Sequence, residues 1–149
     1  MAVISNEELV LGQFDDVQAT GFQLEAGAYP FEVVSVDYVS TVFEKKDGTG
    51  TGTLLKAVYK LTPVGSFDAK MPEACYKGRV VTMELSGFTP EELVGKIATL
   101  IRDTKMKVSN VGAPMLHKEE LPGQRFNAVY QYDNKGYGRI NLPMLAKLN

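Results

Sequence analysis

The chain has 149 residues, of which 44% are hydrophobic and 23% charged. This size and composition are typical of one globular domain with a single core. No apolar run approaches the roughly 18 to 20 residues needed to cross a bilayer, so no membrane partner is expected. Glu7 and Glu8 stand where a secretory signal would be apolar, which predicts a cytoplasmic protein, in the host-cell cytoplasm if the chain is viral.

Charge is unevenly distributed along the chain. The formal net charge is −2, but all 16 Lys and Arg residues follow Tyr38, and only 11 of the 18 acidic residues do. The part from Val39 onward therefore has a net charge of +5. This asymmetry is compatible with an acidic arm and a basic binding surface, because the field at a site depends on local charge. Scatter of charge without a function explains it equally well.

The first 25 residues predict an acidic N-terminal arm, because isolated hydrophobic residues occur there without a helical or strand period. We expect the folded domain to span residues 26–149. Gly27 and Pro30 introduce a predicted strand over residues 29–39, with apolar side chains on both faces. One face holds Tyr29, Phe31 and Val33, and the other holds Val34, Val36 and Tyr38.

Two further strands are expected after segments rich in glycine and proline. The segment EKKDGTGTGT, residues 44–53, predicts a flexible loop with basic flanks. After this loop, residues 54–62 predict a half-buried second strand, with Leu55, Ala57, Tyr59 and Leu61 on one face and Lys56, Val58 and Lys60 on the other. A third strand is expected over residues 79–85.

The clearest predicted element is a helix in the segment SGFTPEELVGKIATLIRDTK. Thr89 is a good N-cap, Pro90 suits the first helical position, and Glu92 completes a capping box. The helix is expected to end near Lys105. Its core-facing stripe is predicted to consist of Leu93, Ile97, Leu100 and Ile101.

A predicted hairpin closes the pattern, with strands over residues 125–132 and 137–142 and a turn at residues 133–136. Three strands, one helix and two strands predict a mainly-β fold, namely a five-stranded Greek-key OB-fold barrel with one α-helix between strands 3 and 4. A small sandwich or an α+β domain is the alternative, because the same elements can close differently.

Residues that would support catalysis are scarce. A nucleophile needs a nearby base, and the single histidine, His117, lies in a predicted loop. One cysteine, Cys75, and one histidine cannot supply the usual zinc ligand sets. The glycines of residues 48–52 match neither of the common phosphate-binding motifs. We therefore expect no enzyme, no cofactor and no metal site.

Aromatic and basic residues interleave on the predicted strands and loops, a pattern that favours binding of single-stranded nucleic acid. Flat rings stack on bases, and cations follow the phosphates. We expect a groove across the second and third strands. An aromatic residue on a strand is also commonly core, and a strand-face lysine is commonly only solvated. The candidate nucleic-acid-binding residues are Tyr38, Phe43, Lys45, Lys46, Lys56, Lys60, Lys77, Arg79, Tyr130, Tyr132, Tyr137 and Arg139.

Three short patterns carry a family resemblance. The first strand opens with G-x-Y-x-x-x-V in AGAYPFEVVSVDY, and YKGR leads into the third strand. The fourth strand and its approach carry Glu120, Leu121, Gly123, Phe126, Ala128 and Val129. Over residues 24–142 the chain resembles a family of small bacteriophage single-stranded-DNA-binding proteins with OB-folds. The resemblance implies sequence-independent binding and protection of single-stranded DNA in phage replication, recombination or repair.

Partners implied by this resemblance are single-stranded DNA, replication or recombination proteins, and further copies of the chain in a homo-oligomer. A second class of function stays open. The chain would then be a viral structural or protein-interaction module that assembles through exposed strand edges and the arm. A stable oligomer without affinity for DNA would favour this second class.

Overall fold

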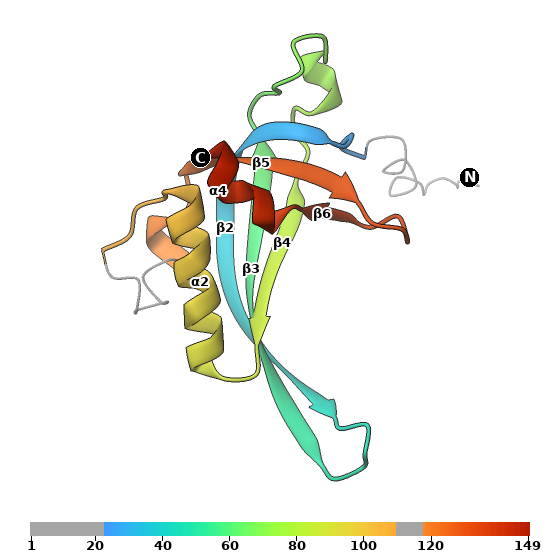
Figure 1. Ribbon diagram of the computed structural model, residues 1–149, viewed down its shortest axis with the longest axis vertical. Helices are drawn as coiled ribbons and strands as arrows, with labels where there is room; N and C mark the ends of the chain where they lie inside the picture. Colours follow the sequence, from blue (N-terminus) through green and yellow to red (C-terminus); the bar gives the residue numbers. More distant parts are fainter. Residues whose placement is uncertain (1–22, 110–117) are drawn as a thin grey trace, which may run out of the picture.

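The computed structural model describes residues 23–109 and 118–149. These residues form a five-stranded antiparallel sheet with one long helix between the third and fourth strands (Figure 1). The predicted mainly-β class and the position of the helix are confirmed. His117 and most of the predicted arm lie outside the described residues. Among the described helices, none is long and apolar enough to span a membrane.

The sheet has the order β4-β3-β2-β5-β6, and all its neighbouring strands are antiparallel. β4 and β6 are the two edges, so the sheet is open between them. The strands are β2 Gly27–Glu44, β3 Thr51–Pro63, β4 Val81–Gly87, β5 Arg125–Tyr132 and β6 Gly138–Ile140. The helices are η2 Glu73–Cys75, α2 Pro90–Thr104, η3 Leu142–Met144 and α4 Leu145–Leu148.

A β-bulge bends β2. Its register with β3 shifts between Val33 and Ser35, which leaves Val34 as an extra residue, 47% exposed. The prediction that Val36 and Tyr38 lie on the face opposite Tyr29, Phe31 and Val33 is therefore wrong, whereas Val34 is exposed. The extra residue turns the second half of the strand, so that both halves face the same core. Tyr29, Phe31, Val33 and Val36 are all buried there, and Tyr38 packs against them.

β2 and β3 continue past the body of the fold as a long hairpin, which projects at the bottom of Figure 1. Their pairing reaches Glu44 and Thr51, beyond the predicted strand ends at residues 39 and 54. A hydrogen bond from Lys45 N to Gly50 O, 2.9 Å, closes the tip. The flexible loop is thus shorter than predicted, because most of its flanking residues pair as strand.

α2 begins and ends as predicted. Thr89 Oγ1 accepts a hydrogen bond from Glu92 N at 3.2 Å, and Glu92 Oε1 accepts one from Phe88 N at 2.8 Å. Lys105 follows the last turn in the left-handed conformation, with φ 60°. The buried residues of α2 are Leu93, Ile97, Leu100, Ile101 and Thr104, which confirms the predicted stripe and adds Thr104.

The last residues fold back on the sheet, an arrangement that the sequence did not predict. Leu145 of α4 is 1% exposed and belongs to the core. Asn127 N donates to Asn149 Oδ1 at 2.9 Å, and Asn149 Nδ2 donates to Asn127 O at 2.8 Å. The Asn149 side chain therefore hydrogen-bonds to both backbone groups of Asn127 and ties the end of the chain to β5.

Two glycines at α2 predict opposite effects of the same substitution. A Cβ on buried Gly87 would lie 2.9 Å from Leu93 N and 2.9 Å from Glu92 Cβ, so Gly87→Ala should lower the free energy of unfolding by about 1–3 kcal/mol. Gly95 is exposed in the middle of α2, with nothing within 4 Å of a Cβ. Gly95→Ala should therefore raise stability by up to about 1 kcal/mol. Urea denaturation measures both; a common sign would contradict this packing.

Candidate nucleic-acid interface

The register of the strands divides the side chains of β3 between two faces. Ala57, Tyr59 and Leu61 are buried on the inner face, as predicted. The opposite side of the sheet, which we call the outer face, is formed by residues paired across β2, β3 and β4. It consists of Ser35, Asp37, Val39, Thr41 and Phe43 on β2, Leu54, Lys56, Val58 and Lys60 on β3, and Thr82, Glu84 and Ser86 on β4.

Lys56 and Lys60 lie on the outer face, as predicted, but their surroundings differ. Lys56 Nζ lies 3.5 Å from Glu84 Oε1. Lys60 is exposed and stands opposite two neutral residues, Ser35 on β2 and Thr82 on β4. Lys60 forms no ion pair with any residue that the structure describes. It is therefore the outer-face cation best placed to meet an external phosphate.

An exposed pair of aromatic rings lies at the hairpin end of the outer face. Phe43 is directly opposite Gly52, and a Cβ on Gly52 would lie 2.6 Å from the Phe43 ring, so the absence of a side chain gives the ring its place. The ring contacts Phe88 edge-on, with centroids 5.9 Å apart. Phe43 is 36% exposed and Phe88 63%. Both rings can offer a face to a base.

Phe88 was not among the predicted site residues. It directly precedes the N-cap Thr89, a position where a hydrophobic residue commonly packs against the fourth helical residue as a staple. The sequence therefore favours a helix-packing role for Phe88. In the structure Phe88 is instead 63% exposed and contacts Phe43 of the hairpin.

Lys45 and Lys46 are exposed at the hairpin tip, as predicted, but acidic neighbours balance them. Hydrogen bonds from Thr49, from its hydroxyl at 2.6 Å and from its N–H at 3.0 Å, lower the pKa of the Asp47 carboxyl. Asp47 therefore stays ionised near neutral pH. Together with Glu44 at the end of β2, Asp47 brings the formal charge of residues 44–47 to zero.

Four predicted residues meet at the other end of the sheet. Arg79, Tyr130, Tyr132 and Tyr137 line one cavity of about 340 Å³ between the start of β4 and the β5–β6 hairpin. Tyr130 is 9% exposed, and the Tyr132 hydroxyl donates to the carbonyl of Leu24, which is itself buried. The Tyr130 and Tyr132 rings therefore pack on the core side of the β5–β6 hairpin. Tyr137, 63% exposed, presents its ring to solvent.

Arg139 and Tyr137 continue the outer face across the open seam between β4 and β6. They share a cavity of about 410 Å³ with Thr82 and Glu84 of β4. Arg139 Nε donates to Asp133 Oδ2 at 3.0 Å, and this hydrogen bond is the main cause of a lowered pKa of the Asp133 carboxyl. The Asp133 turn, which was predicted, thereby fixes the position of Arg139.

Lys77 and Arg79 interact with nearby residues of the β3–β4 connection, on which they lie. Lys77 Nζ lies 3.5 Å from Glu73 Oε1, and Arg79 Nη2 donates to Ala74 O at 3.3 Å. Both cations stand on the segment that enters β4, which projects at the top of Figure 1. They are therefore at the opposite end of the fold from Lys45 and Lys46.

Tyr38 is half-buried among core residues. Its hydroxyl and that of Tyr59 are enclosed and have no hydrogen-bond partner among the described residues. Burial raises the pKa of Tyr38 to about 12. The structure thus places the Tyr38 ring against the core, with its hydroxyl enclosed rather than exposed to solvent.

Within residues 23–109 and 118–149, no group of three or more His, Cys, Asp or Glu side chains could hold a metal ion. Comparison of the chain with protein-family models, with curated proteins and with solved structures gave no match. The resemblance to phage single-stranded-DNA-binding proteins therefore stays a prediction from the sequence.

Two tyrosine variants test this assignment of the buried hydroxyls. Tyr29 Oη donates to Glu25 O at 2.7 Å, so Tyr29→Phe should lower stability by about 1 kcal/mol. Tyr38→Phe should leave stability unchanged or raise it, because the hydroxyl that is removed lacks a partner. Chemical denaturation measures both, and a larger loss for Tyr38→Phe would contradict the placement.

The same tyrosines predict a pH dependence. Burial raises the pKa of both Tyr29 and Tyr38 to about 12, above the ordinary value of 10.0. Between these values the unfolded chain releases protons that the folded chain retains, so stability should fall as the pH rises from 10 toward 12. Tyr38→Phe should make this fall less steep. Denaturation at several alkaline pH values measures the slope, and an unchanged slope would contradict the assignment.

Proposed function

We propose that this chain binds single-stranded DNA without sequence preference. The observation that carries the proposal is the presence of exposed rings at both ends of the outer face, with lysines between them. Phe43 and Phe88 stand at the hairpin end and Tyr137 at the seam end. Lys60 lies between them on β3. Rings that stack on bases and cations that meet phosphates are the two requirements of such binding.

The length of the proposed path along β3 suits an extended nucleic-acid strand. Gly52, beneath the Phe43 ring, and Lys60 are separated by roughly 26 Å along β3, at about 3.3 Å per residue. Lys60 pairs with Thr82, which lines the same cavity as Tyr137. The path along β3 therefore spans several nucleotides, in keeping with the roughly 4 to 16 nucleotides that an OB-fold covers.

We further infer that the sheet is a five-stranded OB-type barrel with Greek-key connections, opened between β4 and β6. The strand order supports this inference, because the fourth strand in chain order, β5, lies beside the first, β2. OB-folds bind oligonucleotides on the face of their second and third strands and on the loops beside it. On this inference, β3, β4 and the β2–β3 and β5–β6 hairpins would correspond to that binding surface.

The distribution of charge also supports the proposal. The described residues contain all 16 cations of the chain and 14 of its 18 acidic residues, for a net charge of +2. The remaining four acidic residues belong to residues 1–22. With the resemblance noted above, the proposed role is protection of single-stranded DNA in phage replication, recombination or repair.

Removal of the exposed rings should weaken binding. In fluorescence polarisation with labelled oligothymidine, we expect Phe43→Ala, Phe88→Ala and Tyr137→Ala each to raise the dissociation constant by about 5- to 150-fold, because each stacked base is worth about 1–3 kcal/mol. Phe67→Ala is the matched control, since Phe67 is 58% exposed but lies on the β3–β4 connection. If all four variants bind oligothymidine as tightly as the unmodified chain, the outer face is ruled out as the DNA-binding surface.

Removal of cations should change the salt dependence. Each phosphate contact on a single strand contributes about 0.7 to the slope of log K against log salt. Lys60→Ala should reduce the slope by about 0.7, and replacement of Lys45, Lys46 and Lys60 together by about 2. Lys147→Ala on α4, which packs against α2, is the control. An unchanged slope in the triple variant would remove these lysines from the interface.

A further inference from the structure

The free edge of β4 runs along a groove formed by three adjoining cavities. The cavity of about 340 Å³ contacts the start of the strand, that of about 410 Å³ its middle, and one of about 560 Å³ its end. The first two share Tyr137 and Gly138, and the last two share Glu84 and Leu142. β4 has a hydrogen-bonded neighbour on one side only, and its other edge can accept a further strand where Lys96 Nζ releases Ser86 O.

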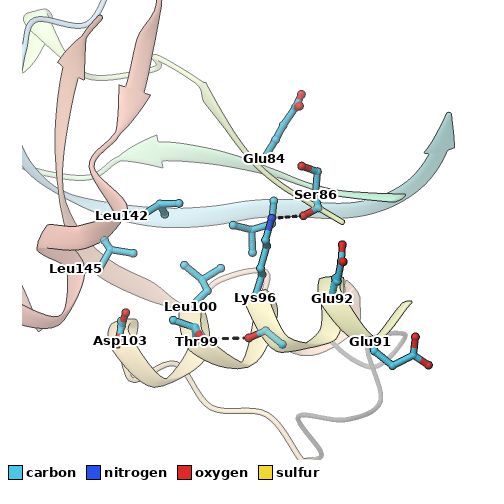
Figure 2. Close-up of a pocket in the computed structure, with 12 residues that line it drawn as sticks. Glu84, Ser86, Glu91, Glu92, Lys96, Thr99, Leu100, Asp103, Leu142 and Leu145 are labelled. Atoms are coloured by element: carbon cyan, nitrogen blue, oxygen red, sulfur yellow. Dashed lines mark hydrogen bonds between the residues drawn. The ribbon is translucent and has the colours of Figure 1, made fainter. Parts of the chain in front are cut away.

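The largest of these three cavities lies between β4, α2 and the C-terminal segment (Figure 2). One of its lining residues, Glu92, accepts the N–H of Phe88 at 2.8 Å. Its apolar wall is made by Leu85, Leu100, Leu142 and Leu145. In Figure 2, Leu100, Leu142 and Leu145 gather at one end of it. An apolar wall of this kind suits hydrophobic side chains of a bound segment.

The rim of this cavity is acidic. Four carboxylates, those of Glu84, Glu91, Glu92 and Asp103, line it with one cation, Lys96. Lys56 offsets Glu84 at 3.5 Å, and Arg102 offsets Asp103 at 3.1 Å. Glu91 forms no ion pair with any described residue. The Glu92 carboxylate accepts a hydrogen bond from the backbone N–H of Phe88.

The helix side of the groove has a simple sequence basis. Glu91, Gly95, Thr99 and Asp103 recur every four residues along α2 and line the cavity together. The two central positions carry small side chains, and the two outer positions carry carboxylates. A Cβ on Gly95 would meet nothing within 4 Å. This row therefore leaves space in its centre and negative charge at its ends.

We propose that this part of the groove binds an extended segment of a partner protein, in which apolar residues alternate with Lys or Arg. The free edge of β4 supplies backbone hydrogen bonds, as in other cases of strand addition. Apolar side chains then face the leucine wall, and basic ones face the carboxylate rim. This proposal does not depend on DNA binding.

Charge decides between this occupant and the others. A nucleic-acid strand would bring its phosphates toward Glu91 and Glu92. The chain's own residues 1–22 contain four acidic residues and no Lys or Arg, so the same carboxylates repel them. A basic and apolar segment of another protein is the occupant that complements both the rim and the wall.

The probe is a short fluorescent peptide in which valine and lysine alternate, titrated into the full-length chain and measured by anisotropy. Three control peptides carry glutamate in place of lysine, serine in place of valine, or N-methyl groups on alternate backbone nitrogens. We expect the valine–lysine peptide to bind at least about tenfold more tightly than each control. Equal binding of the glutamate peptide or of the N-methylated peptide would overturn the proposal.

Two substitutions at one position locate the site. Gly95→Leu should fill the groove and weaken the peptide by about tenfold or more, whereas Gly95→Ala should leave its affinity within about twofold. Glu91→Gln should weaken it by about two- to fivefold at low salt. Circular dichroism checks that each variant is folded. Unchanged peptide affinity in folded Gly95→Leu overturns the site. Self-association of the unmodified chain that Gly95→Leu abolishes also overturns the proposal, because the occupant is then a second copy of the chain.

Discussion

The fold depends on the bulge at Val34, because β2 is the strand on which both halves of the sheet are built. β2 spans 18 residues and pairs with both β3 and β5. A shift of one residue in a strand moves every later side chain to the other face. The bulge therefore brings Val36 and Tyr38 onto the core, and it also directs Phe43 outward. The exposed ring pair and the buried core thus follow from the same extra residue.

Elements with local signals could be predicted from the sequence, and elements set by tertiary pairing could not. The N-cap Thr89 and the apolar stripe of α2 were predicted, since their signals lie within a few residues of each other. The bounds of β5 also agree. Val34 gave no such signal, because a β-branched residue suits an ordinary strand as well as a bulge. The extended hairpin was missed because its lysines and glycines favour a loop in isolation.

The candidate site was predictable in residue type but only partly in placement. Tyr130 and Tyr137 belong to the same hairpin, yet one ring is 9% exposed and the other 63%. Tyr130 packs against Gly138 and Tyr132 and belongs to the core cluster, whereas Tyr137 lies at the exposed turn. Likewise, Lys56 and Lys60 lie on the same face, and the acidic neighbour that distinguishes them, Glu84, comes from another strand. Such differences depend on contacts between segments far apart in the chain.

The open edge of β4 connects two regions of opposite charge. Arg79 and Arg139 line the cavities at its start and middle, and Glu91 and Glu92 line the one at its end. Natural edge strands are commonly protected by lysine, and Lys96 Nζ donates to Ser86 O at 2.5 Å beside this edge. A single side chain can leave that carbonyl at little cost, so the protection is reversible. Glu92 accepts the N–H of Phe88, a ring of the proposed DNA path, so a basic peptide bound beside Glu91 and Glu92 would neighbour the DNA at the hairpin end of the outer face.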